Sequence, residues 1–126
     1  MVGLIDTSIF VGVESAGLDI SKIPDEVAVP IPTIAELELG VLMASDVEAR
    51  QRRLTTLQFA NSLIPVPIDA EVGRAWAGLV AQLRANGQKA PINDTWIAAT
   101  AIANDMVVVT QDADYDNMPG VKVVRI

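Results

Sequence analysis

The chain has 126 residues, 51% of them hydrophobic, which is enough for one domain with a buried core and too few for two. It contains neither cysteine nor histidine, and this excludes disulfide scaffolds, thiolate zinc sites, imidazole ligation of haem and every Ser-His-Asp or Cys-His catalytic arrangement. Its 16 acidic and 9 basic residues give a formal charge of −7, which taken alone argues against a polyanionic partner.

The first residues do not resemble a targeting segment. Asp6 interrupts the opening apolar stretch, and no basic segment precedes it. No apolar run in the chain approaches the ~18–20 residues of a membrane span. We therefore expect a cytoplasmic protein. Any chemistry must use oxygen ligands, namely carboxylates, hydroxyls and backbone groups, and these suit Mg²⁺ or Mn²⁺.

Short apolar segments flanked by turn residues predict strands that alternate with amphipathic helices. In chain order the first half predicts a strand over 1–5, a helix over about 9–17, a strand over 27–31, a helix over 33–44 and a helix within 46–63. The second half predicts an edge strand over 64–68, a helix over 69–87, a helix over 96–103, a strand over 106–110, a loop over 111–120 and a strand over 121–126. This alternation predicts a single three-layer α/β domain over residues 1–126, with a mainly parallel sheet flanked by helices.

Acidic residues stand where the predicted strands end and the helices begin. Asp6 and Asp112 follow strands, and Glu36 and Asp94 lie in the first turns of helices. In an open α/β sheet these positions meet at one edge, where ligands collect. Asp114 is a plausible fifth member. Such a cluster would repel itself unless a divalent cation were bound, so the pattern predicts a metal site.

Each of these acids also has a purely structural interpretation. Asp6, Asp69 and Asp94 suit helix caps, since a carboxylate accepts hydrogen bonds from free backbone N–H groups. Glu36 lies three residues after Thr33, which is the spacing of a capping box. Capping does not explain why acids distant in sequence should converge on one edge of the sheet.

Glu36 and Glu38 compete for one role, because two positions along a helix are rotated by roughly 200° and cannot face the same cluster. Glu36 shares its face with the small residues Thr33 and Gly40, whereas Glu38 falls among larger apolar side chains such as Val41. We therefore assign Glu36 to the cluster.

Four segments of the chain resemble the PIN-domain ribonucleases, in particular the VapC toxins of bacterial and archaeal toxin–antitoxin pairs. They are residues 4–8 (LIDTS), 33–37 (TIAEL), 93–99 (NDTWIAA) and 109–115 (VTQDADY). The resemblance covers essentially the whole chain. It implies a Mg²⁺- or Mn²⁺-dependent endoribonuclease that cuts structured RNA, of the tRNA or rRNA class, and thereby inhibits translation. It also implies a homodimer that a VapB-type antitoxin neutralises.

The resemblance carries over residue by residue. The family's acidic quartet, which binds the metal, matches Asp6, Glu36, Asp94 and Asp112. Asp114 matches an acid often found just before the aromatic residue, and Ser8 and Thr110 match hydroxyls that border the metal site. Many relatives have Asn where Asp112 stands, so the choice between Asp112 and Asp114 for the fourth acid stays open.

This ligand set predicts a mechanism in which one or two metal ions polarise the scissile phosphate and lower the pKa of a water ligand. The products would carry 5′-phosphate and 3′-hydroxyl ends. Phosphate contact would fall to scattered cations, densest at Arg50, Arg52 and Arg53, although a solvated helix face explains that group equally well.

Two other functions compete. The first is a non-catalytic α/β module that binds RNA or a protein partner. The second is a phosphoacceptor receiver domain that uses Asp69, which would need an acidic pair after the first strand and a lysine at the end of a late strand. Here Asp6 stands alone and Lys122 lies inside its predicted strand.

Overall fold

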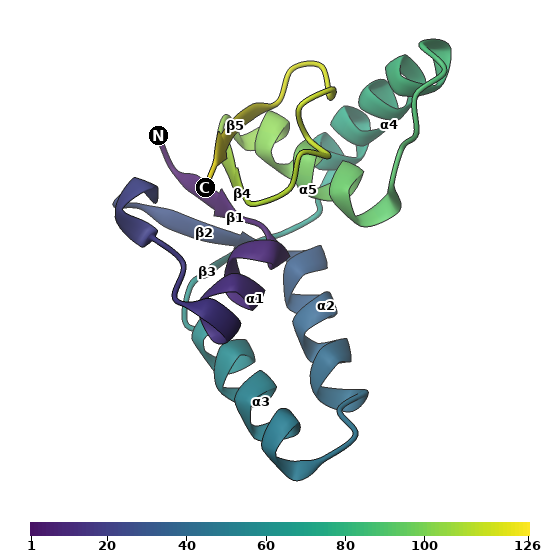
Figure 1. Cartoon of the computed structure of the whole chain (residues 1–126). Helices are drawn as coiled ribbons and strands as arrows, with labels where there is room; N and C mark the ends of the chain where they lie inside the picture. The colour runs from purple at the N-terminus through teal and green to yellow at the C-terminus, as the bar shows by residue number, and fades with distance from the viewer.

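The computed structural model describes the backbone of residues 1–126 and every side chain except that of Ala16. Figure 1 shows helices on both sides of a central sheet. The elements are β1 (Gly3–Ile5), α1 (Thr7–Ala16), a 3₁₀ turn (Ile20–Lys22), β2 (Val27–Pro30), α2 (Ile31–Leu42), α3 (Val47–Asn61), β3 (Ile64–Val66), α4 (Ala70–Ala85), α5 (Ile92–Asn104), β4 (Val107–Thr110) and β5 (Lys122–Arg125). Among the described residues, no helix is both long and apolar enough to cross a membrane.

The five strands form one sheet in the order β3-β2-β1-β4-β5, and all four neighbouring pairs run parallel. The prediction of a mainly parallel sheet is therefore confirmed. The two prolines around β3 suit its place at an edge, because proline has no N–H to donate to a second neighbour. The order differs from the 2-1-3-4-5 order of receiver-type folds, which excludes the receiver alternative.

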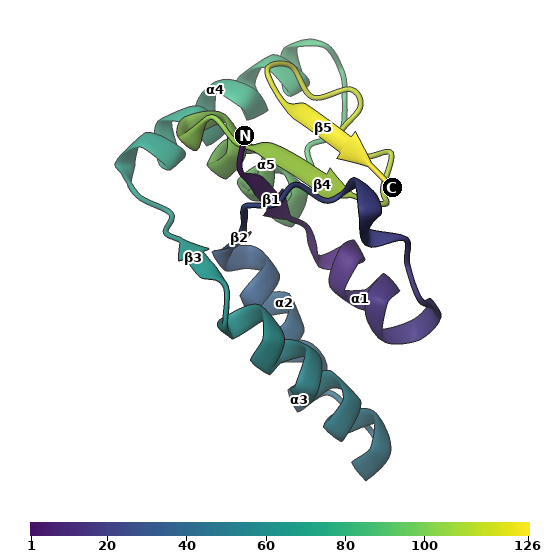
Figure 2. The same ribbon diagram turned by 90° about the vertical axis from the view of Figure 1, so that its left-hand side faces the viewer.

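Successive residues of the central strands point to opposite faces of the sheet. Leu4 and Val108 pack toward α4 and α5, in a cluster with Leu79, Leu83 and Ile97. Their neighbours Ile5, Val29 and Val109 pack on the other face, with Ile9 and Phe10 of α1, Leu37 of α2 and Leu57 of α3. Figures 1 and 2 show these two helix layers on either side of the strands. Both faces are covered, which explains why the inner strands β1, β2 and β4 are almost entirely apolar.

The helices that connect β1 and β4 to the other strands lie on opposite faces of the sheet. From β1 the chain crosses through α1 to β2, whereas β4 is reached from β3 through α4 and α5 on the opposite face. The two strand ends stay joined, since Asp6 N–H donates to Val109 O at 3.0 Å. This point, where the strand order reverses, is where open α/β sheets place ligands.

Three helices begin earlier than predicted, α1 at Thr7 and the other two directly after prolines. α2 begins at Ile31 with Pro30 as its N-cap and Pro32 in its first turn, so Thr33 is not the cap and the capping-box interpretation of Glu36 is wrong. α5 begins at Ile92 with Pro91 as its N-cap, so Asp94 lies in the first turn and does not cap it. In both cases a proline, with its φ already helical, starts the helix ahead of the polar residue. On α3, Leu57 is buried, whereas Leu54 is 41% exposed.

Candidate active site

Asp6 lies at the carboxyl end of β1, where it caps α1, and only 3% of it is exposed. Its Oδ2 accepts hydrogen bonds from the hydroxyls of Ser8 and Thr110, both at 2.8 Å. The Thr110 hydroxyl comes from the end of β4, 104 residues away in sequence. The two hydroxyls that we expected to border the site thus both hold the same oxygen of Asp6, and they lie 3.2 Å from each other.

Tyr115 joins Asp6 to Asp94, a contact that sequence analysis missed. Its hydroxyl lies 3.0 Å from Asp6 Oδ1 and 3.3 Å from Asp94 Oδ1, and the side chain is 1% exposed. Burial, followed by the negative charges of Asp6 and Asp94, raises the pKa of Tyr115, so the phenol stays protonated and donates. The available signal was that the chain's single tyrosine follows two acids in an otherwise small and polar loop.

Asp94 is held in place by the packing of α5 against α4. The Trp76 indole N–H donates to the Thr95 hydroxyl at 3.1 Å, and the Trp76 and Trp96 rings stack with their centroids 4.6 Å apart. Thr95 and Trp96, which make these contacts, directly follow Asp94 on α5. Burial, a contact with the Asp114 carboxyl and the charge of Asp6 raise the pKa of Asp94 to about 7.

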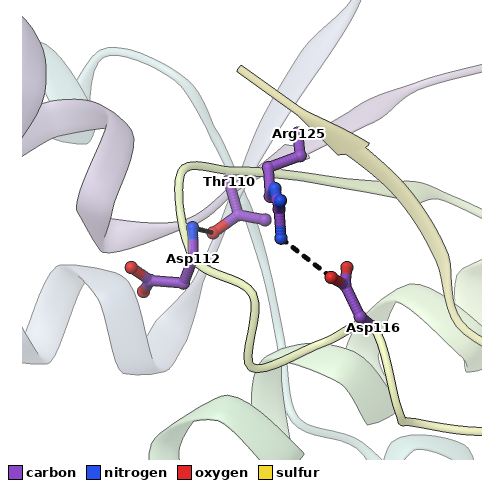
Figure 3. A network of polar contacts seen from close by, with 4 residues as sticks. All are labelled: Thr110, Asp112, Asp116 and Arg125. Carbon is purple, nitrogen blue, oxygen red and sulfur yellow. Dashed lines mark hydrogen bonds and ion pairs between the residues drawn. The ribbon is translucent and has the colours of Figure 1, made fainter.

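Asp112 and Asp114 both stand in the loop that follows β4. The Asp112 backbone N–H donates to the Thr110 hydroxyl at 3.0 Å, and Figure 3 shows its carboxylate pointing away from the Arg125–Asp116 ion pair. Burial, followed by the charges of Asp6 and Asp114, raises the pKa of Asp112. Asp114 is exposed. Its charge acts on both Asp94 and Asp112, so four aspartates are electrostatically coupled.

Glu36 is linked to those aspartates through Thr7. Its Oε1 accepts a hydrogen bond from the Thr7 hydroxyl at 2.9 Å, and that hydroxyl is also 3.2 Å from the Thr33 hydroxyl. Thr7 follows Asp6 directly in the chain. Glu36 is half-buried and Glu38 is exposed, and of the two it is Glu36 that the structure turns toward the strand ends. Sequence analysis missed the bridging role of Thr7.

The chemistry of these donors fits a hard divalent cation, because all of them are carboxylate or hydroxyl oxygens. Burial is the first cause of the raised pKa values of Asp94 and Asp112, and the neighbouring acids add to it, so part of each shift reflects carboxylates gathered without a positive charge among them. Among the side chains that the structure describes, no three carboxylates are close enough together to bind one metal ion as they stand. A bound ion would therefore have to draw neighbouring carboxylates toward the fixed Asp6.

The chain matches a known protein family and several named proteins along most of its length. The family described as PIN domain matches residues 3–121. A Mycobacterium tuberculosis protein named ribonuclease VapC4 is 48% identical over 124 residues, covering 98% of this chain and 95% of that protein. Ribonuclease VapC5 of the same organism is 40% identical over 128 residues, with 98% and 95% coverage.

Solved structures agree with this relationship. The crystal structure of the toxin–antitoxin system VapBC-5 from Mycobacterium tuberculosis matches with a TM-score of 0.90 and 39% identity, over 99% of this chain and 98% of that chain. DNA-bound VapBC from Salmonella typhimurium matches with a TM-score of 0.86 at 19% identity, over 99% and 98% of the two chains, and shows the fold alone.

Proposed function

The chain belongs to the PIN domain family and, within it, to the VapC ribonucleases, and we propose that it is an endoribonuclease whose acidic centre acts with a bound Mg²⁺ or Mn²⁺ ion. The observation that carries this proposal is the convergence on Asp6 of Thr110, Tyr115 and Asp94 from the far end of the chain. That convergence sets a buried, rigidly held carboxylate among other acids at the edge of the sheet where ligands bind.

Asp6, Asp94 and Asp112 are the residues that would hold the metal, with Glu36 either binding a second ion or orienting the attacking water. When bound, the metal supplies Lewis-acid polarisation of the scissile phosphate and makes a nearby water more acidic. The Ser8 and Thr110 hydroxyls fix Asp6 Oδ2, so this carboxylate keeps its position when substrate enters.

Glu36 is suited to the water-orienting role because only one of its oxygens is held. The Thr7 hydroxyl binds Oε1, which leaves Oε2 to accept a proton from a water molecule. Attack of this water on the scissile phosphorus, with the 3′-oxygen as the leaving group, would leave a 5′-phosphate and a 3′-hydroxyl. A 2′,3′-cyclic phosphate would instead require the RNA 2′-hydroxyl as the nucleophile, and its detection would contradict this step.

The relatives also suggest partners. VapBC-5 was solved as a toxin–antitoxin system, and on that ground this chain would act as a toxin neutralised by a VapB-type antitoxin. The substrate would be a structured RNA of the tRNA or rRNA class, cut to inhibit translation in the cytoplasm, and the active species would be a homodimer.

The decisive experiment incubates purified protein with total RNA in Mg²⁺ and then in EDTA, for the wild type, Asp6→Asn and Asp94→Asn. Cleavage should occur only for the wild type in Mg²⁺. Asp116→Asn is the matched control, because Asp116 lies in the same loop as Asp112 but pairs with Arg125 at 2.8 Å. Sequencing of the RNA ends identifies the product chemistry.

Equal cleavage in all samples would remove the metal-site mechanism. A non-catalytic module, the remaining alternative, predicts RNA or antitoxin binding with no metal-dependent cleavage of any RNA by the wild type. The two functions are therefore separated in the same set of reactions.

A further inference from the structure

A groove of about 450 Å³ opens beside Glu36 and is built by α1, α2 and α3. Its wall includes Thr7 and Glu36, the pair joined by a 2.9 Å hydrogen bond, together with Arg52 and Arg53 of α3. Because Thr7 directly follows Asp6, the groove adjoins the acidic centre. A ligand that spans both would meet carboxylates at one end and guanidinium groups at the other.

The arginine side chains are available for a ligand. Arg53 Nη1 donates to Gly40 O at 2.7 Å, which anchors this guanidinium across α2 and leaves its other N–H groups free. Arg52 and Arg53 are both exposed. Among the side chains that the structure describes, the two ion pairs join Lys122 to Asp105 and Arg125 to Asp116, so neither arginine of the groove is held in an ion pair. Two carboxylates, Glu14 and Glu36, line the same groove, so the attraction for a phosphate is local to the guanidinium groups.

The loop after β4, which borders the acidic centre elsewhere, carries more acid than base. It holds Asp112, Asp114 and Asp116, and Arg125 beside it is already bound to Asp116 at 2.8 Å. A polyanion reaching Asp6 would therefore be repelled on that side and attracted on the side of α3. Guanidinium groups bind phosphate through paired N–H donors, which gives both attraction and orientation.

We infer that Arg52 and Arg53 form a phosphate-binding subsite that holds the RNA backbone next to the cleaved bond. This inference rests on the proposed nuclease function and extends it with residues that set the direction of the strand. The RNA enters along α3, its phosphates contact Arg52 and Arg53, and the strand continues past Glu36 and Thr7 to the acidic centre at Asp6. Of the three clustered arginines, Arg50 has no part in this, because it is exposed on the same helix but does not line the groove.

The test measures how salt weakens RNA binding. Bulk transfer RNA is titrated into the full-length protein in EDTA, where metal-dependent cleavage is off, at several KCl concentrations. Each lost phosphate contact lowers the magnitude of the slope of log K against log salt by about 0.7 on a single strand and by about 0.9 on a duplex. The double variant Arg52→Gln/Arg53→Gln should therefore lose about 1.4 to 1.8 from the slope, and Arg50→Gln should match the wild type.

Arg52→Gln alone guards against a folding artefact, since the Arg52 guanidinium makes no hydrogen bond to the described residues, whereas that of Arg53 anchors Gly40. The slope of Arg52→Gln should fall by about 0.7 to 0.9. In Mg²⁺ the same variant should raise KM for RNA cleavage and leave kcat unchanged, because the subsite binds the ground and transition states equally.

Equal slopes for Arg50→Gln and Arg52→Gln would overturn the subsite, and they would do so even if the wild type cleaves RNA, which leaves the nuclease function standing. If the arginine variants lose slope but the wild type cleaves no RNA, the nuclease proposal is overturned and the groove remains an RNA-binding surface. Unchanged RNA binding with weakened antitoxin binding would assign the groove to the protein partner and overturn the inference.

Discussion

The hydroxyl of Tyr115 is shared between Asp6 and Asp94, at 3.0 Å from one carboxylate and 3.3 Å from the other. The phenol has one proton, which the two carboxylates share, and this shared donor offsets part of the repulsion between them. Tyr115 thereby sets the separation of the two residues to which we give the main metal-binding roles.

Tyr115→Phe should therefore damage metal binding more than it damages the fold. The ring still fills its buried site, but Asp6 and Asp94 lose a donor, at a cost of about 1–3 kcal/mol in unfolding free energy. Loss of such an outer partner typically weakens a metal site by about 10- to 100-fold. Calorimetric titration with Mn²⁺, set beside the thermal midpoint, checks both parts. An unchanged Mn²⁺ affinity would contradict the role given to this hydroxyl.

Protonation of Asp94 should oppose metal binding within an accessible pH range. The pKa of Asp94 is raised to about 7, so the folded, metal-free protein retains a proton there that an unfolded chain releases near pH 4. Since the metal requires the ionised carboxylate, Mn²⁺ affinity should rise with pH up to about 7 and then level off. The measurement is Mn²⁺ titration across this range.

The same proton makes a separate prediction for stability without metal. A pKa raised on folding stabilises the protein below the unfolded pKa, and this contribution is lost as pH rises through the folded value. Asp94→Asn mimics the protonated form. The thermal midpoint of Asp94→Asn, relative to that of the wild type, should therefore increase as pH rises from about 4 to about 8 in EDTA. A constant difference between the two proteins would show that Asp94 does not titrate in this window.

Asp69 should behave as a structural acid. Its side chain accepts a hydrogen bond from Val72 N–H at 3.0 Å and caps α4, away from the four coupled aspartates. Asp69→Ala should cost about 1 kcal/mol in unfolding free energy, while the kcat for RNA cleavage stays unchanged. Chemical denaturation and a cleavage assay test the two halves. Loss of activity in a folded variant would mean that the site extends further than described.

Asp112 should matter more than Asp114 for cleavage. The Thr110 hydroxyl holds the backbone N–H of Asp112 at 3.0 Å, and the residue is half-buried beside Asp6, whereas Asp114 is exposed. Asp112→Asn removes a charge from a fixed position, so it should lower kcat/KM by more than Asp114→Asn does. Parallel assays of both variants at equal Mg²⁺ decide the point, and the reverse order would make Asp114 the fourth acid.

Sequence patterns predicted the elements of this fold because each strand is a short apolar segment between turn residues. They also predicted that Asp6 and Asp112 follow neighbouring strands, because carboxyl ends of parallel strands share an edge. Helix starts were less accurate, since Pro30 and Pro91 each begin a helix ahead of the polar residue that looked like its cap.

Side-chain contacts across the chain were the part that sequence could not supply. No periodicity indicates that Tyr115 reaches two carboxylates, because its position depends on the course of an irregular loop. For the same reason Arg52 and Arg53 could not be separated from Arg50 until α3 was packed against α1 and α2. The metal-binding roles of Asp6, Glu36, Asp94 and Asp112 remain predictions.

The contacts of Asp6 with Thr110 and Tyr115 span 104 and 109 residues of the chain. A polypeptide emerging from the ribosome cannot complete this centre before nearly its last strand has been made, whereas β1 to β3 and their helices are already available to fold. Nascent and prematurely terminated chains should therefore be harmless to the cell that makes them. Only full-length product would need to be restrained.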